Sequence, residues 1–237
     1  MRDTREFYEA YWRWRRENDR LNERVPERIH AAIRLFERYD APSQRVLDVG
    51  CGEGTLGRLL RERHSTALEL AGLDISAGAL ELARRHYDQV YQVNVDQERI
   101  RDRIGERSFD TIVALETLEH LFAPQAALEQ IRDLLAPGGQ IIVSFPNIAW
   151  WRYRLALLAG RFPEEHHIFD AVEHLQHFTL PSFRRLLDRS GYRATAIDGE
   201  FLQPIGVRHL PRAARRALNA RFPNLFGYQV VVRAVCR

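Results

Sequence analysis

Short apolar runs alternate with helical patterns along much of this chain. Apolar runs bounded by turn residues predict strands at 45–50, 67–73, 90–95, 109–115 and 140–145. Apolar residues that recur every three or four positions predict helices over 7–39, 55–63, 76–86 and 124–135. Strands that alternate with helices at this spacing predict a parallel sheet covered by helices on both faces.

Turn and capping residues mark where several of these elements begin or end. Pro26 suits the first turn of a second helix within 7–39, so this segment is expected to hold two helices. Ser76 is a suitable N-cap for the helix over 76–86. The run Pro137-Gly138-Gly139 is expected to end the helix over 124–135.

The alternation of strand and helix patterns stops after Asn147. Residues 148–178 contain two tryptophans and four histidines without a clear strand. The patterns then predict a helix at 181–190, a strand at 193–201, an arginine-rich helix at 211–221 and a strand at 227–236. We therefore expect a single domain over 1–237, with a helical segment at 1–40 and insertions at 148–180 and 203–226.

Composition narrows the class of protein. With 237 residues, of which 45% are hydrophobic and 28% charged, the chain is globular rather than disordered. No apolar run reaches the roughly 18–20 residues that a membrane helix needs, and the first residues lack the apolar core of a secretory signal. Cys51 and Cys236 are the only cysteines, which excludes a disulfide framework. We expect a cytoplasmic protein.

The positive charge is unevenly distributed. The net charge is +3, and every one of the 35 basic residues is an arginine. No acidic residue follows Glu200, whereas seven arginines do. Such asymmetry can mark an anionic partner, but a solvated basic face explains it equally well and is the interpretation we favour. No nucleic-acid partner is expected, and a homodimer is left open.

The clearest motif is the glycine-rich loop that follows the first strand, Asp48-Val49-Gly50-Cys51-Gly52-Glu53-Gly54. Glycines let a backbone turn tightly and approach a ligand without a Cβ in the way. Open α/β sheets bind ligands at this carboxyl end of their strands. Residues 52–57 also satisfy the dinucleotide pattern G-x-G-x-x-G. However, an acid before the turn repels a pyrophosphate and suits a ligand with an amino group and a sulfonium.

Two further acids follow the next strands. Asp74 ends the second strand, at the distance from the glycine loop where a carboxylate accepts hydrogen bonds from ribose hydroxyls. Asp96 ends the third strand, where it can accept a hydrogen bond from an adenine amino group. Both acids could instead be ordinary surface carboxylates, but the two positions favour a nucleoside ligand.

Four motifs in order, at 46–54, 72–76, 109–113 and 135–139, resemble those of class I S-adenosylmethionine-dependent methyltransferases. The resemblance covers nearly the whole chain. It implies a Rossmann-like, doubly wound, mostly parallel sheet of seven strands with an antiparallel last strand. It also implies that segment 1–40 forms a lid that carries Tyr8 and Tyr11 over the cofactor.

The resemblance implies a set of cofactor contacts, with S-adenosylmethionine as cofactor and S-adenosylhomocysteine as product. The methionine part would lie against Asp48, Gly50, Gly52 and Gly54, the ribose against Asp74, and the adenine against Val95 and Asp96. Further contacts would come from Cys51, Ile75, Leu115 and Tyr11.

Transfer to a hydroxyl needs a group that takes the proton of the acceptor. Glu116, Glu119 and His120 recur at helical spacing after the fourth strand, so one helical turn would bring them together. This stretch resembles the Glu-x-x-Glu-His element of ubiquinone-pathway and small-RNA ribose methyltransferases, in which a further histidine would correspond to His174. We expect His120, His174 and Glu119 to be catalytic, with a histidine as the base.

The same residues offer an alternative. Glu116, Glu119, His120 and His174 form a ligand set for a divalent metal. A bound metal is not favoured, because many relatives of this fold use a similar glutamate and histidine without one.

The residues at 144–148, 151–155 and 160–163 resemble two narrower groups. One is the methionine-biosynthesis protein W family, and the other comprises bacterial methyltransferases that occur with cell-surface polysaccharide genes. We therefore expect O-methylation of a small-molecule or glycan acceptor. The alternatives are a non-catalytic methyltransferase-like partner subunit of a biosynthetic enzyme, and a metal-assisted RNA ribose methyltransferase.

Overall fold

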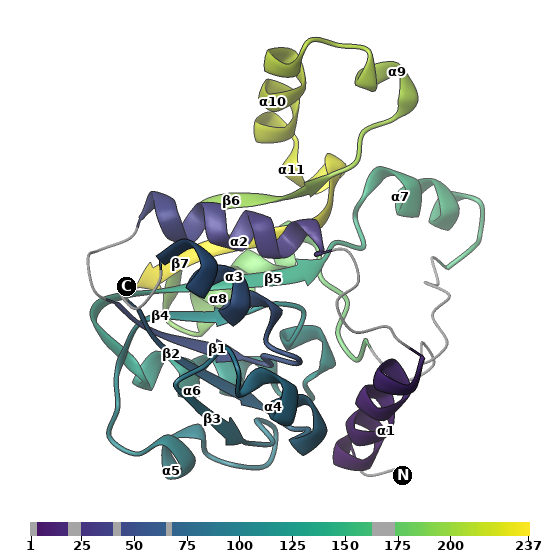
Figure 1. Cartoon of the computed structure of the whole chain (residues 1–237). Coiled ribbons are helices and arrows are strands. Elements are labelled where there is room, and N and C mark those ends of the chain that lie inside the picture. The colour runs from purple at the N-terminus through teal and green to yellow at the C-terminus, as the bar shows by residue number, and fades with distance from the viewer. Residues whose placement is uncertain (1–3, 19–24, 40–43, 65–67, 163–173) are drawn as a thin grey trace.

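The fold is described from a computed structural model over residues 4–18, 25–39, 44–64, 68–162 and 174–237. Within these ranges, seven strands form one sheet in the order β3-β2-β1-β4-β5-β7-β6 (Figure 1). The strands are β1 Gln44–Val49, β2 Leu68–Asp74, β3 Gln89–Gln92, β4 Phe109–Ala114, β5 Leu135–Pro146, β6 Tyr192–Phe201 and β7 Gly227–Cys236. Strands β1 to β5 pair in parallel, and β7 runs antiparallel to both β5 and β6. The predicted Rossmann-like sheet with an antiparallel last strand is confirmed.

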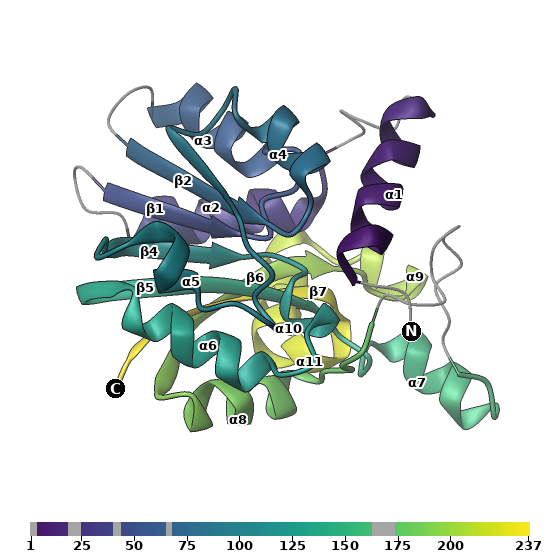
Figure 2. The same ribbon diagram turned by 90° about the horizontal axis from the view of Figure 1, so that it is seen from below.

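Helices cover both faces of the sheet (Figure 2). One face carries α2 Glu27–Arg38, α3 Thr55–His64 and α4 Ala77–Ala83, and the other carries α5 Ile100–Ile104, α6 Pro124–Asp133 and α8 Leu180–Arg189. Helix α1 Thr4–Glu17 packs against α4. The remaining helices are α7 Trp151–Leu158, α9 Ile205–Arg208, α10 Arg212–Arg221 and α11 Pro223–Phe226. In the described part of the chain, no helix has both the length and the apolar character needed to cross a membrane.

The sheet separates two hydrophobic clusters. Strands β1, β2 and β4 are buried along almost their whole length, which explains why they appear in the sequence as continuous apolar runs rather than alternating ones. Ser76 caps α4 as predicted, since its side chain accepts a hydrogen bond from the backbone N–H of Ala79.

The prediction for the end of α6 was wrong. This helix ends at Asp133, and Pro137-Gly138-Gly139 lies inside β5 rather than in a terminating turn. Leu135 pairs with Phe109 of β4, so strand pairing takes over directly after the helix. The register of the two strands shifts between Phe109 and Thr111, opposite the glycines, as expected for a local bulge.

Strand β3 is shorter than predicted and leaves Val93 to Asp96 beyond its end. The neighbouring strand β2 stops at Asp74, whose carbonyl accepts the N–H of Val93, so the later residues have no strand to pair with. Helices α5, α7, α9 and α11 were not predicted. Each is only four to eight residues long, too short for a clear periodic pattern.

An aromatic stack anchors α8 to the sheet. The ring of Phe183 lies 4.2 Å from that of Phe145 on β5, in a stacked arrangement, and 5.2 Å from that of Phe178. Thr179 and Ser182 form a capping box that fixes the start of the helix. The chain therefore returns from the insertion after β5 to a well-defined place on the sheet.

Replacing Phe183 with alanine tests this anchor. The side chain is fully buried, so we expect the free energy of unfolding to fall by about 3–5 kcal/mol in urea denaturation. Phe122→Ala is the matched control, because that ring is 60% exposed and its loss should change stability by about 0.5 kcal/mol or less. An equal loss of unfolding free energy in the two variants would contradict the burial of Phe183 between α8 and the sheet.

Candidate cofactor and acceptor site

The glycine-rich loop lies where the carboxyl ends of β1 and β2 meet. The N–H groups of Gly50 and Cys51 both donate to the carbonyl of Leu73, at 2.8 and 3.0 Å. Gly50 and Gly52 have φ of 76° and 53°, in the region that glycine adopts without strain. A Cβ on Gly50 would lie 2.6 Å from the hydroxyl oxygen of Thr117, so the loop packs closely against the residues that follow β4.

Asp48 is buried beneath this loop and bonded to Tyr87. The Tyr87 hydroxyl donates to Asp48 Oδ2 at 2.5 Å and accepts the N–H of Gly57 at 3.1 Å. Burial raises the pKa of Asp48 to about 7; the bond from Tyr87 opposes this shift, and the nearby charge of Asp74 adds to it. Tyr87 was not predicted, because it belongs to no motif and is distant from the loop in sequence.

Asp74 links the loop to α4. Its Oδ2 accepts the N–H of Gly52 and its Oδ1 accepts the N–H of Ser76, both at 2.9 Å. Burial raises the pKa of this carboxyl, and the backbone N–H groups partly offset that rise. The carboxylate therefore has a fixed position at the end of β2, as the sequence predicts for this acid.

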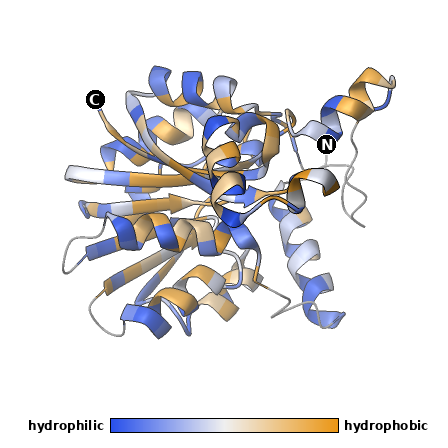
Figure 3. Ribbon diagram, turned by 90° about the horizontal axis from the view of Figure 1, so that it is seen from above, coloured by the Kyte–Doolittle hydropathy of each residue, from blue (hydrophilic) through white to orange (hydrophobic). Residues whose placement is uncertain are grey.

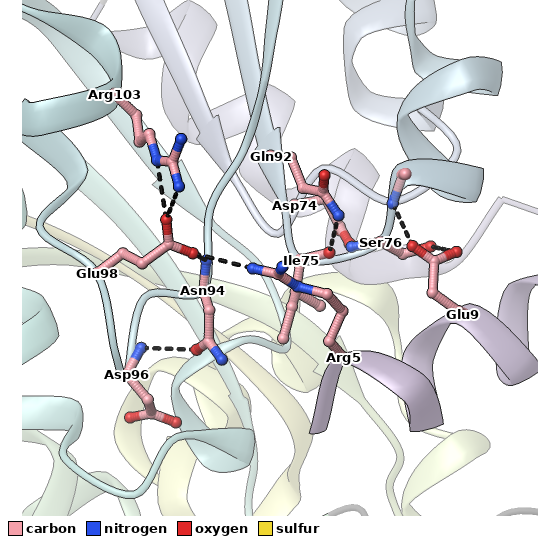
Figure 4. A network of polar contacts seen from close by, with 11 residues as sticks. Arg5, Glu9, Asp74, Ile75, Ser76, Gln92, Asn94, Asp96, Glu98 and Arg103 are labelled. Atoms are coloured by element: carbon pink, nitrogen blue, oxygen red, sulfur yellow. Dashed lines mark hydrogen bonds and ion pairs between the residues drawn. The ribbon is translucent and has the colours of Figure 1, made fainter. Parts of the chain in front are cut away.

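Helix α1 lies beside these residues (Figure 4). The Glu9 carboxylate accepts hydrogen bonds from the Ser76 hydroxyl at 2.9 Å and from the N–H groups of Ala77 and Gly78 at 2.6 and 3.2 Å. A Cβ on Gly52 would lie 2.7 Å from the ring of Trp12. The Tyr11 ring packs edge-on against Trp12, with centroids 5.4 Å apart.

Asp96 and its neighbours lie beyond β3. The Asp96 carboxylate accepts the N–H groups of Phe122 and Ala123, at the start of α6. Its own N–H donates to the side chain of Asn94, which is buried. Of the other predicted contacts, Cys51 is buried, and Ile75, Val95 and Leu115 are partly exposed. Asn94 was not predicted, although it stands at the same strand end as Asp96.

Glu119, His120 and His174 come together on the acceptor side. One potential ligand atom from each lies within 4.8 Å of the others, and the two imidazole rings are 5.0 Å apart. The ring of Tyr8 on α1 approaches His120 edge-on at 6.2 Å. The cluster thus joins two residues that follow β4 to His174, which comes from the segment after β5.

Glu119 is fully buried, and neither carboxylate oxygen has a hydrogen-bond partner within the described ranges. Burial raises its pKa well above the usual value, and the charge of Glu116 adds to this shift. A buried carboxyl without a partner is costly, so the cluster is suited to receive a proton, a polar ligand group or a cation.

Glu116 is separate from this cluster. Residues Leu118–His120 form a 3-10 turn that starts only after Glu116. The Glu116 carboxylate accepts the Ser144 hydroxyl at 3.1 Å and the side-chain N–H of Gln229 at 3.2 Å. Its φ is 52°, an uncommon conformation for a residue with a side chain. One helical turn does not gather all four predicted metal ligands.

The two tryptophans after β5 serve packing in this structure. Both indole N–H groups donate to the carbonyl of Leu202, at 2.9 Å from Trp150 and 2.7 Å from Trp151. His166 and His167 lie outside the described residues.

Comparisons with known proteins place this geometry in a family. The model of a methyltransferase domain matches residues 12–197, more than half of the chain. A ubiquinone biosynthesis O-methyltransferase of Xylella fastidiosa is 34% identical over 133 residues, which cover 54% of this chain and 52% of that protein. One of the same name from Pseudomonas putida is 30% identical over 63% of this chain and 64% of its own length. The chain thus spans about half to two thirds of these curated relatives.

Solved structures share the fold. An S-adenosylmethionine-dependent methyltransferase from Clostridium acetobutylicum has a TM-score of 0.61 at 11% identity, over 97% of this chain and 98% of that one. The CcbJ methyltransferase from Streptomyces caelestis has a TM-score of 0.60 at 16% identity, over 90% of each chain. With the domain match and the seven-stranded sheet, this chain belongs to the class I S-adenosylmethionine-dependent methyltransferases.

Proposed function

We propose that the protein transfers a methyl group from S-adenosylmethionine to a hydroxyl group of a small organic acceptor. The observation that carries this proposal is the cluster of His120, His174 and Glu119, which supplies bases for the proton of a hydroxyl. The relatives named as ubiquinone biosynthesis O-methyltransferases support an O-methylated small molecule. A saccharide also offers hydroxyl groups as methyl acceptors, so the second prediction below tests aromatic and saccharide acceptors together.

The proposed cofactor site is the glycine-rich loop with the strand ends around it. Gly50, Gly52 and Gly54, together with Cys51, would let the backbone approach the methionine part, and the charge of Asp48 would face its ammonium group. Asp74 would accept hydrogen bonds from the ribose hydroxyls. The adenine would lie among Ile75, Val95, Asp96 and Leu115, with Tyr11 on the lid. The close packing of the loop and the two N–H groups that hold Asp74 support this fit.

The bound sulfonium supplies a methyl group that is already activated for displacement. The protein then has to align the acceptor with it, an effect worth about 7–11 kcal/mol in favourable cases. In this proposal, His120 takes the acceptor proton at an imidazole nitrogen, and His174, 5.0 Å away between ring centres, orients it or shares the proton. Glu119, whose pKa burial raises, would supply the buried carboxyl group of the cluster.

A metal-assisted variant of the same reaction is favoured by one specific observation. Two imidazoles and a buried carboxylate that has no hydrogen-bond partner in the described part of the chain form a donor set that suits a borderline divalent cation. Glu119, His120 and His174 would hold such an ion, which would lower the pKa of the acceptor hydroxyl. Glu116 would not be a ligand, because its carboxylate accepts hydrogen bonds from Ser144 and Gln229.

The first prediction concerns the cofactor. Asp74→Asn should weaken binding of S-adenosylhomocysteine by about tenfold to a hundredfold in calorimetric titration, because a charged acceptor of ribose hydrogen bonds is lost. Asp110→Asn, at a partly exposed acid of β4, is the control and should bind as the wild type does. No binding to the folded wild type would refute the cofactor assignment.

The second prediction concerns the acceptor. With a panel of dihydroxylated aromatic acids, phenols and monosaccharides, the wild type should convert S-adenosylmethionine to S-adenosylhomocysteine on at least one member. His120→Ala should lower kcat on that member by about a hundredfold or more, while the Kd for S-adenosylhomocysteine changes less than about twofold. Unchanged turnover in the variant would exclude His120 as the base.

Titration of Mn²⁺ into the protein without cofactor separates the two mechanisms. A bound ion that is lost in Glu119→Gln and kept in Glu116→Gln would establish the metal variant. If the wild type shows no binding, the mechanism rests on the histidine alone.

The third prediction concerns pH. The pKa of Asp48 is about 7 in the folded protein, against about 4 in an unfolded chain. The folded state therefore binds more protons between these values, and its stability falls as pH rises through this window. Asp48→Asn should be more stable than the wild type by about 1–4 kcal/mol at pH 8 and by much less at pH 4. Urea denaturation of both proteins between pH 4 and pH 8 measures this difference. If the free energy of unfolding depends on pH in the same way in both proteins, the raised pKa of Asp48 is contradicted.

A further inference from the structure

Two segments project beyond the α/β body, α7 after β5 and α9–α10 after β6 (Figure 1). Helix α7 has no buried residue, although half of it is leucine and alanine. Leu158 is 84% exposed and Ile205 on α9 is 75% exposed. In Figure 3 the outer turn of α7 shows as an apolar stretch at the edge of the molecule.

The two projections share one base. Trp150 and Trp151, at the start of α7, both donate their indole N–H groups to the carbonyl of Leu202. Leu202 directly follows β6 and leads into α9. Arg154 reaches the carbonyl of Asn224 on α11, at 3.4 Å. These bonds join the roots of both projections, which leave the sheet after the carboxyl ends of β5 and β6.

The charge on these projections has a single sign. Residues 148–162 contain three arginines and no acid, and residues 203–226 contain five arginines and no acid. Arg152 on α7 and Arg212, Arg216 and Arg221 on α10 are exposed. Exposed leucines therefore lie beside arginines, with no carboxylate within residues 148–162 or 203–226 to balance the charge.

This pairing of exposed apolar and exclusively basic side chains is characteristic of surfaces that lie on anionic lipid. A second copy of the chain would bring arginines against arginines across a twofold axis, which is unfavourable. A nucleic acid would use the arginines but would leave the leucines of α7 without a partner. We propose that α7, α9 and α10 form a surface that binds the face of a membrane containing anionic lipid.

The surface can be tested on the full chain by co-sedimentation with vesicles, without any methyl transfer. The vesicles are phosphatidylcholine alone, or phosphatidylcholine mixed with phosphatidylglycerol. Binding should require phosphatidylglycerol and weaken with added salt, because the arginine contacts are screened. Arg212→Glu combined with Arg216→Glu should weaken binding by about fivefold or more per arginine. Leu155→Glu combined with Leu158→Glu should remove most of what remains, since apolar insertion is lost.

The matched control is Arg184→Glu combined with Arg185→Glu, which makes the same charge change at exposed positions of α8. It should bind vesicles as the wild type does, and circular dichroism should show all variants folded. An equal loss in this control would overturn the proposal in favour of a general charge effect. Three other results would also overturn the proposal. They are no vesicle binding at low salt, retention of the protein by RNA but not by vesicles, and a dimer in solution that the leucine variant dissociates.

Discussion

The position of the glycine-rich loop depends on the buried contact between Asp48 and Tyr87. The phenol lies beneath the loop, donates to the Asp48 carboxylate and accepts the N–H of Gly57. A Cβ on Gly57 would lie 2.5 Å from the Tyr87 ring. Glycine is therefore needed in this segment for the approach of the aromatic ring as well as for the turn. An acid that carries an elevated pKa is tolerated here because the same phenol supplies its hydrogen bond.

Asp74, the second buried carboxylate, connects the glycine-rich loop to helix α4 and, through the start of α4, to α1. Asp74 joins the loop to the start of α4, and Glu9 of α1 accepts hydrogen bonds from the same helix start. The loop, α4 and α1 thus depend on one group of acids, of which Asp48 and Asp74 are buried, and on backbone N–H donors. Since three acids share this small region, a ligand with positive charge would relieve their mutual repulsion. This is the electrostatic reason for an ammonium and a sulfonium in the proposed ligand.

The acceptor side is organised differently. Its groups follow β4 or come from the residue range after β5, and a backbone hydrogen bond connects the two segments. The N–H of Gln176 donates to the carbonyl of Glu119 at 2.9 Å, which aligns the two segments. It brings His174 beside His120, so the cluster depends on the insertion after β5. The insertion after β6 contributes no member of that cluster and projects from the body instead.

Much of the fold was predictable from local pattern. The alternation of apolar runs and helical spacing gives the layered sheet, because periodicity follows from backbone geometry alone. The motifs identified Asp48 and Asp74, since strand ends of a parallel sheet meet at one edge whatever the details of packing. The end of α6 was missed because the pairing of Leu135 with Phe109 is not visible in local sequence.

Other features were decided only by tertiary structure. Tyr87 reaches Asp48 because α4 packs against β2, a contact between distant residues that no spacing reveals. Helical spacing grouped Glu116 with Glu119 and His120, but a residue with φ of 52° breaks that turn and points Glu116 toward Ser144 and Gln229. The sequence by itself determined the sheet, the loop and the candidate acids and bases. Tertiary packing decided which of them meet, because side-chain contacts depend on elements that are far apart along the chain.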